Sequence, residues 1–435
     1  MSESTDKIQK LQTELNEIQN QKQKSDNKIK SLQSQLNQIN EENNTLKRKL
    51  DEMESFHNYN GLSSAQKEIL YKISELKKSE DFESIYNFFV ELSSQGNQKM
   101  ISKACEEGLW KKIAPKKDDD DEKNVLHVAC EKRNLKLVKS LIESGCDKES
   151  RSKNGYTPLI FASGNDKPEV VKYLISIGAD KEAKNNNGYT PLIFASKNGH
   201  LEVVKYLISN KADKEAKNNN GYTPLIFASK NGHLEVVKYL ISNKANKEAK
   251  NNDGYTPLIW ASENGKLDVV KYLISNKADK EAKDDYGYTP LIRASKEGHL
   301  EVVKYLISVG ANKEVKNKRG DTPLIWASQN GKLEVVKYLI SNKADKEAKN
   351  NRGYTPLCVA SEHGHLEVVK YLISVGADKE AKNNFGNTPL HLSSWIGHSE
   401  VVQYLVSVGA KKEVKNNEGY TPVMVATSDI KRFLK

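Results

Sequence analysis

Cysteine and long apolar runs are scarce in this sequence. Its four cysteines, Cys105, Cys130, Cys146 and Cys358, have neither the spacing of a zinc site nor the density of a disulfide framework. No run approaches the ~18 consecutive apolar residues of a membrane span, and the polar start, MSESTDKIQK, does not look like a signal peptide. We therefore expect no transmembrane segment and a cytoplasmic protein, with a nuclear location left open.

Catalytic and metal-binding motifs are also missing. The sequence has no Gly-rich phosphate loop, no GxSxG and no HExxH. Five histidines recur at multiples of 33 residues, which spreads them along the chain instead of gathering them in one site: His200, His233, His299, His365 and His398. We expect no enzyme, no catalytic residue, no metal and no cofactor.

What the chain has instead is a repeat. The motif GxTP begins every 33 residues, without insertion, at Gly155, Gly188, Gly221, Gly254, Gly287, Gly320, Gly353, Gly386 and Gly419. A fixed period of this length predicts a solenoid, in which each unit buries its apolar face only by stacking on its neighbours.

One unit, GYTPLIFASKNGHLEVVKYLISNKADKEAK from Gly188 to Lys217, predicts two helices. Thr190 is a good N-cap, Pro191 suits the first helical position and Gly199 suits a helix end. A second helix should begin at His200 or Leu201, with an apolar face made of Leu201, Val204, Leu207 and Ile208. The polar tail predicts an extended segment that turns into the next unit.

The TPL motif, the small pair Ala195 and Ser196, the Gly-His pair and the 33-residue period together resemble the ankyrin repeat family. The resemblance covers about 122–435, because the segment from Lys123 aligns one period before Gly155. It implies an all-α solenoid of helix-turn-helix units with short hairpin loops, about ten units of which the first and last are atypical. It also implies a concave groove, lined by the first helices and the loop tips, where partners bind.

Two departures from the family pattern concern local structure. The histidine of TPLH survives only as His127 and His391, and we expect apolar contacts to replace its hydrogen bonds elsewhere. The glycine after the second helix is a lysine in four units, at Lys211, Lys244, Lys277 and Lys343. A left-handed lysine costs about 1 kcal/mol, unless the preceding asparagine adopts that conformation instead.

The N-terminus follows a seven-residue pattern. One position of the heptad holds Ile8, Leu15, Ile29, Leu36 and Leu50, and the other holds Leu11, Ile18, Leu32, Ile39, Leu46 and Met53. This pattern predicts a coiled coil over 1–57, which we expect to form a homodimer through residues 8–57. A single solvated helix and a heteromeric coiled coil are the alternatives.

Between these parts, the helical periodicity of residues 58–121 predicts a helical linker, which we expect to cap the first repeat of the array at 122–435. The acidic run Asp118–Asp121 fits a solvated linker, with a ligand for a basic partner as the alternative. The net charge of +10 comes from lysines spread through the repeats. Evenly spaced lysines are typical of a solenoid surface, and binding to nucleic acid or to an anionic membrane is the alternative.

Because the units are nearly identical, the positions that differ between them are free to encode a partner. Units 254–418 carry aromatic and charged residues at the first helix and the loop tips, and these form our candidate site: Trp260, Tyr286, Arg293, Arg319, Asp321, Trp326, Arg352, Phe385 and Trp395. Trp, Tyr and Arg dominate binding hot spots. Trp260 and Trp326 could instead pack against neighbouring helices, and the charge of Arg293 must reach water or a carboxylate. We hypothesise a non-enzymatic scaffold or adaptor that holds a protein partner of unknown identity.

Overall fold

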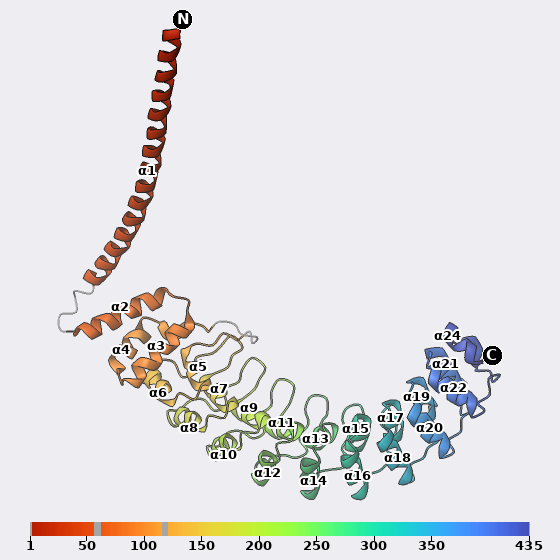
Figure 1. Ribbon diagram of the computed structural model, residues 1–435. Coiled ribbons are helices and arrows are strands. Elements are labelled where there is room, and N and C mark those ends of the chain that lie inside the picture. Colours follow the sequence, from red (N-terminus) through yellow and green to blue (C-terminus); the bar gives the residue numbers. More distant parts are fainter. Residues whose placement is uncertain (1, 56–61, 115–120, 435) are drawn as a thin grey trace.

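The computed structural model describes residues 2–55, 62–114 and 121–434, which form helices joined by loops and one isolated antiparallel bridge between Ile113 and Asn124 (Figure 1). The helices are α1 (Ser2–Ser55), α2 (Ser64–Lys78), α3 (Phe82–Ser94), α4 (Gln98–Glu106), η2 (Leu109–Lys111), α5 (Val125–Glu131), α6 (Leu135–Glu143), α7 (Pro158–Gly164), α8 (Pro168–Ser176), α9 (Pro191–Asn198), α10 (Leu201–Ser209), α11 (Pro224–Asn231), α12 (Leu234–Ser242), α13 (Pro257–Glu263), α14 (Leu267–Ser275), α15 (Pro290–Glu297), α16 (Leu300–Ser308), α17 (Pro323–Gln329), α18 (Leu333–Ser341), α19 (Pro356–Glu362), α20 (Leu366–Ser374), α21 (Pro389–Ile396), α22 (Ser399–Ser407), α23 (Pro422–Val425) and α24 (Ser428–Leu434).

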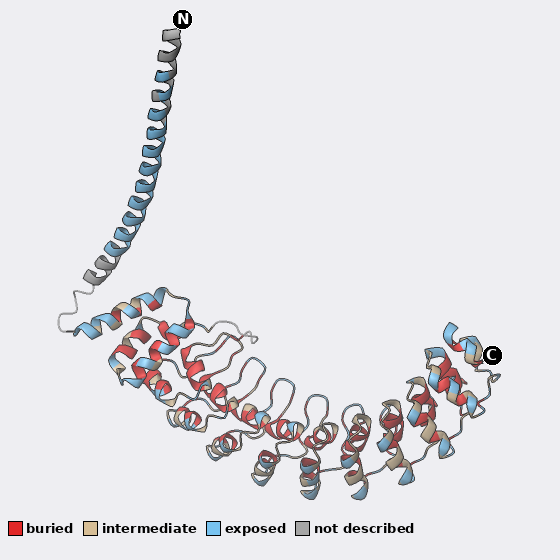
Figure 2. Cartoon of the chain, in the orientation of Figure 1, coloured by how far each residue is buried: buried red, intermediate tan, exposed pale blue. Residues whose placement is uncertain are grey.

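The N-terminal helix α1 is long and exposed along its described part (Figure 2). Its described heptad residues leave their apolar side chains in solvent: Leu15, Ile18, Ile29, Leu32, Leu36, Ile39 and Leu46. An apolar stripe of this spacing is typical of coiled-coil helices. The coiled coil and its oligomeric state stay predictions.

Helices α2 to α4 cover the first unit of the array. Ser63 caps the N-terminus of α2 with a capping box. Helices α3 and α4 contact α6, and Ile85, Phe89 and Ile101 are fully buried. The thiol of Cys105 in α4 lies 3.3 Å from that of Cys146, which follows α6. This segment therefore shares one continuous apolar core with the repeats.

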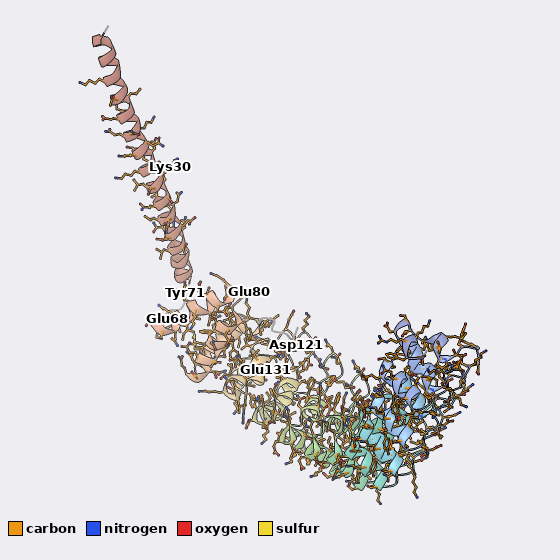
Figure 3. The ribbon with its side chains drawn as sticks, turned by 45° about the vertical axis from the view of Figure 1, so that its right-hand side comes forward. Lys30, Glu68, Tyr71, Glu80, Asp121 and Glu131 are labelled. Atoms are coloured by element: carbon orange, nitrogen blue, oxygen red, sulfur yellow. The ribbon has the colours of Figure 1, made fainter. Side chains whose placement is uncertain are left out.

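Asp121 differs from the expected solvated linker. It is buried, and its carboxylate accepts hydrogen bonds from the hydroxyl of Ser152 at 3.0 Å and the backbone N–H of Asn154 at 2.9 Å. Figure 3 shows it near Glu131, against the body of the array. Asp121 thus supports the first loop tip; Asp118, Asp119 and Asp120 lie outside the described residues.

The Thr N-cap and the Pro at the helix start are found in every unit from α7 on, whereas, among the described first helices, glycine ends only α9, α11, α15 and α21. In α9, the Thr190 hydroxyl accepts from the N–H of Ile193 at 3.2 Å, and Gly199 ends the helix in the left-handed conformation with φ +80°. The buried face of α10 is Val203, Val204 and Leu207, whereas Leu201 and Ile208 are only half-buried. The predicted face is therefore confirmed at Val204 and Leu207, while Leu201 and Ile208 pack at the edge of the core and the sequence reasoning left out Val203.

Contacts between units use the framework residues. Ala195 and Ser196 are fully buried where neighbouring first helices meet. The imidazole Nε2 of His200 lies 2.9 Å from the carbonyl of Gly164 in the preceding unit, and the equivalent histidines repeat this contact. Each of seven loop lysines also donates to a carbonyl one unit further on: Lys184, Lys217, Lys250, Lys283, Lys316, Lys349 and Lys382. These seven lysines therefore contribute to the contacts between units.

The four lysines after the second helix adopt the left-handed conformation themselves, with φ between 61° and 64°. The preceding Asn210 has φ −90°, and its side-chain amide donates to the carbonyl of Tyr206 at 2.9 Å. The alternative in which the asparagine carries the left-handed conformation is wrong. The array bends into an arc, with the second helices on its outer side and the first helices and loops on its inner side (Figure 1).

Candidate functional site

A ladder of aromatic rings runs along the inner side of the first units. Its rungs alternate between the residue after each tip glycine and the sixth residue after it. The ring of Phe194 lies 5.3 Å from that of Tyr156 and 4.9 Å from that of Tyr189, and the pattern continues through Tyr222 and Phe227. The ladder packs consecutive units together, since such ring pairs are favourable at these separations.

Trp260 and Trp326 belong to this ladder. Trp260 lies 4.5 Å from the ring of Tyr255 and 5.7 Å from that of Tyr222, and Trp326 lies 5.5 Å from that of Tyr288. Trp326 is only 7% exposed and Trp260 is half-buried. These ring contacts support the packing alternative for the buried Trp326, whereas Trp260 is half-buried and its contact with a partner stays a prediction.

Arg293 replaces a ring in the same ladder. Its guanidinium carbon lies 4.6 Å from the ring centre of Tyr255 and 4.1 Å from that of Tyr288. Its Nη2 lies 2.6 Å from a carboxylate oxygen of Asp284, and its Nη1 lies 3.2 Å from Glu263. The side chain is buried, so its charge reaches carboxylates instead of a partner, and the expectation of a contact residue is corrected here too.

Burial and pairing act against each other in this network. Burial would lower the pKa of the Arg293 guanidinium, but the hydrogen bond with Asp284 and the charge of Glu263 raise it above its ordinary value. Burial likewise raises the pKa of Glu263, against the opposing effect of Arg293. The sequence reasoning missed both acids. Comparing units would have found Asp284, because the same position is asparagine in the neighbouring units, at Asn251 and Asn317.

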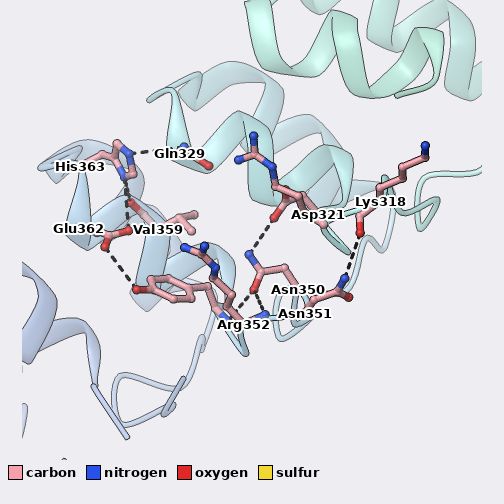
Figure 4. Close-up of a pocket in the computed structure, with 11 residues that line it drawn as sticks. Lys318, Asp321, Gln329, Asn350, Asn351, Arg352, Val359, Glu362 and His363 are labelled. Atoms are coloured by element: carbon pink, nitrogen blue, oxygen red, sulfur yellow. Dashed lines mark hydrogen bonds and ion pairs between the residues drawn. The ribbon is translucent and has the colours of Figure 1, made fainter. Parts of the chain in front are cut away.

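Asp321 interrupts the ladder, because it stands where the preceding units have tyrosine. It is 3% exposed, and its carboxylate accepts from the side-chain amide of Asn350 at 2.8 Å and from that of Asn317 at 3.3 Å. In the ladder, the residue after one tip glycine lies beside the sixth residue after the following tip glycine. The neighbour of Asp321 in this order is Val359, which is not aromatic either. With both rings missing, a hollow of about 460 Å³ opens above them (Figure 4). Asp321 shapes this hollow from below and is not an exposed contact.

The hollow is rimmed by cations from two loop tips, Lys318 and Arg319 from one and Arg352 from the next. Glu362 and His363 close its far side, where Glu362 accepts from the hydroxyl of Tyr354 at 3.4 Å. Burial and the charge of Glu362 raise the pKa of Tyr354 to about 12, so this phenol stays neutral.

A second hollow of about 480 Å³ follows directly. Arg352, Tyr354 and Glu362 line both hollows, and the second adds Phe385, Asn387, His391, Trp395 and Tyr420. Here again the ladder lacks rings, because Asn387 and Leu392 occupy its positions. A third hollow, of about 320 Å³, shares Lys318 and Arg319 with the first and extends to Tyr286. The three form one groove from Tyr255 to Tyr420.

Five of the predicted residues present their side chains to this groove. Tyr286 is 60% exposed, Phe385 54% and Trp395 60%, and Arg319 and Arg352 are exposed beside them. The structure therefore divides the predicted site. The exposed tips and Trp395 line the groove together with the buried Arg293 and Asp321, whereas the buried Trp326 and the half-buried Trp260 lie outside its lining. Tyr354, Glu362 and Tyr420 are lining residues that the sequence reasoning missed.

A family model described as ankyrin repeats (3 copies) matches the chain at residues 93–185, 165–251, 243–317, 309–383 and 375–434. These matches span most of the sequence. The chain belongs to the ankyrin repeat family. Among solved structures, the crystal structure of the human ASB11 ankyrin repeat domain is 25% identical; the match covers 49% of this chain and 96% of that one, with a TM-score of 0.46. No curated protein matches the sequence.

Metal-binding groups and helices that could span a membrane are two further features that bear on function. Among the residues that the structure describes, no three His, Cys, Asp or Glu side chains are grouped so as to hold a metal ion. In the same ranges, no helix has the length and hydropathy needed to cross a membrane. Ankyrin repeats are generally protein-protein interaction modules.

Proposed function

We propose that this ankyrin protein is a non-enzymatic scaffold or adaptor that binds a protein partner in the groove lined by Tyr286, Arg319, Arg352, Phe385 and Trp395. One observation carries the proposal. These side chains are exposed at consecutive units, whereas the units from Gly188 to Asp253 share the same framework and present asparagine or aspartate at their tips. Exposed Tyr, Trp and Arg beside apolar hollows are the anchors of protein interfaces.

The test uses the first units as a template. A quadruple variant changes Tyr286, Arg319, Arg352 and Phe385 to Asn, which stands at the equivalent position of earlier tips as Asn187 and Asn220. The full chain, with and without these changes, is used to capture partners from cell lysate. Bound proteins should be lost with the quadruple variant. An unchanged set of captured proteins at equal folded concentration would place recognition elsewhere on the chain.

We also propose that α1 joins two copies of the chain. The exposed heptad stripe supports this, because such a stripe in solution favours burial against an identical helix. Deletion of residues 1–57 should convert a dimer into a folded monomer in sedimentation. The same oligomer with and without the segment would contradict the proposal.

Nucleic acid or an anionic membrane is the second candidate, supported by the net charge of +10. Against it, seven loop lysines are engaged with neighbouring carbonyls, and the helix lysines pair with glutamates, as Lys205 does with Glu202 at 2.8 Å. A steep fall of affinity with salt would favour this candidate. The cytoplasmic location stays a prediction from the sequence.

A further inference from the structure

The second residue of each loop tip changes in a definite order along the array. Asn187, Asn220 and Asp253 are followed by Tyr286, Arg319, Arg352 and Phe385, and then by Glu418. Two cations are thus flanked by two aromatic rings, and these by two acids. We call the four central residues the tip row.

The tip row is evenly spaced by backbone hydrogen bonds. The N–H of Lys318 donates to the carbonyl of Tyr286, that of Asn351 to Arg319 and that of Asn384 to Arg352, each at 3.0 Å. Packed helices of neighbouring units lie about 8–10 Å apart. An extended peptide advances about 3.3 Å per residue, so it advances about three residues for each unit of the array.

The two arginines of the tip row have no ion-pair partner within the described chain. Of the two carboxylates in the hollow beside them, Asp321 is occupied by Asn350 and Asn317, and Glu362 accepts from Tyr354. Both guanidinium groups are exposed and available to a ligand carboxylate, the anion that their forked geometry fits best. At the two ends, Tyr286 and Phe385 stand beside the hollows of about 320 and 480 Å³, which suit apolar side chains.

Resting on the proposed function, we infer that the groove takes an extended peptide segment of about ten residues in which a large apolar residue, an acidic residue, an acidic residue and a second large apolar residue follow one another at three-residue intervals. Asp253 and Glu418 repel further acids beyond the two ends, which sets the register. The same two acids disfavour a continuous polyanion such as single-stranded nucleic acid, whose phosphates would pass both ends of the tip row.

The experiment selects binders from a displayed library of random 12-residue peptides on the full chain. The comparison is R319N/R352N, which installs the residue of the plain tips. The matched control is K244N/K277N, which removes the same charge from exposed left-handed positions on the loops after α12 and α14, where asparagine is tolerated. Circular dichroism melting verifies that all three chains fold.

We expect enriched peptides to carry two acids three residues apart with aromatic or large aliphatic residues at the ends. A selected peptide should bind at least tenfold more weakly to R319N/R352N, and unchanged to K244N/K277N. Changing its acids to amides, or moving one acid by one residue, should cause a comparable loss.

Three results would overturn the inference: enriched peptides without the paired acids, equal binding to R319N/R352N, or tighter binding of a 12-nucleotide oligo-dT probe than of the selected peptide. The peptide inference is wrong, and the proposed function still stands, if the quadruple tip variant loses its captured proteins while the library shows no acidic pattern. Both fail if neither experiment depends on the tip row.

Discussion

The units from Gly188 to Asp253 and those from Gly287 to Glu418 share one framework and differ in what they do with their inner side. In the first group the aromatic ladder is complete and the tips carry asparagine or aspartate. In the second group the ladder loses rings at Asp321, Val359 and Asn387, and the groove hollows at those places. The difference teaches that a solenoid can open a groove by omitting aromatic rings from its inner side while its core stays unchanged.

The largest expected effect concerns the one charged rung. Arg293→Phe restores the ladder residue of the plain units but leaves Asp284 buried without its cation, so the free energy of unfolding should fall by about 3–5 kcal/mol. Adding Asp284→Asn, which completes the plain combination, should recover most of the loss. Chemical denaturation of the single and double variants measures the coupling. If Arg293→Phe alone is as stable as the parent chain, the ion pair between Arg293 and Asp284 does not stabilise the fold.

The next effect is a pH dependence to which the buried histidine of the first unit, His127, should contribute most among the histidines. Burial lowers the pKa of His127 to about 4, from an ordinary value near 6.5. Between these values the unfolded chain takes up a proton that the folded chain cannot, so stability should be lost as pH falls from 6.5 to 4, by about 2–3 kcal/mol.

The matched control is His127→Ile, which carries the residue of the plain units and should flatten this part of the stability profile. His391, whose pKa burial also lowers, should show the same direction. An identical acid loss in the His127→Ile chain would assign it to other groups.

A third change converts the second group toward the first. Asp321→Tyr with Val359→Phe refills two rungs and should close the hollow of about 460 Å³ without a large change in stability. Affinity for a captured partner should fall about tenfold, or ~1.4 kcal/mol. Isothermal titration of the purified partner measures this. Undiminished affinity would show that the hollow is incidental to binding.

The smallest effect concerns the left-handed lysines, which occur in both groups. Lys211→Gly, Lys244→Gly and Lys277→Gly should each stabilise the array by a few tenths to about 1 kcal/mol, because relief of the strained conformation exceeds the extra entropy of glycine in the unfolded chain. Gly310→Lys should do the reverse, and denaturation midpoints report both. A lower midpoint for the glycine variants would reveal stabilising contacts of the lysine side chains.

The helices and their ends could be predicted because their signals are local. Thr190, Pro191 and Gly199 act through hydrogen bonds and backbone angles within a few residues, and the 33-residue period places every copy alike. The exposed tips were predicted for the same reason, since a loop residue beside a turn glycine has little around it. The apolar face of α10 was predicted at Val204 and Leu207, but the burial of Val203 was missed because it depends on contacts outside the helix.

The sequence by itself determined the period, the all-helical unit, the family and the positions free to vary. Whether a variable residue faces a partner or its own neighbours depended on tertiary packing, because the inner side of each first helix meets side chains from the units on either side. Arg293 could be assigned only once Asp284 and Glu263 were seen around it, and Asp321 only once Asn350 of the next unit was seen to donate to it. The burial of these side chains depends on contacts with the neighbouring units, so the sequence of a single unit does not determine it.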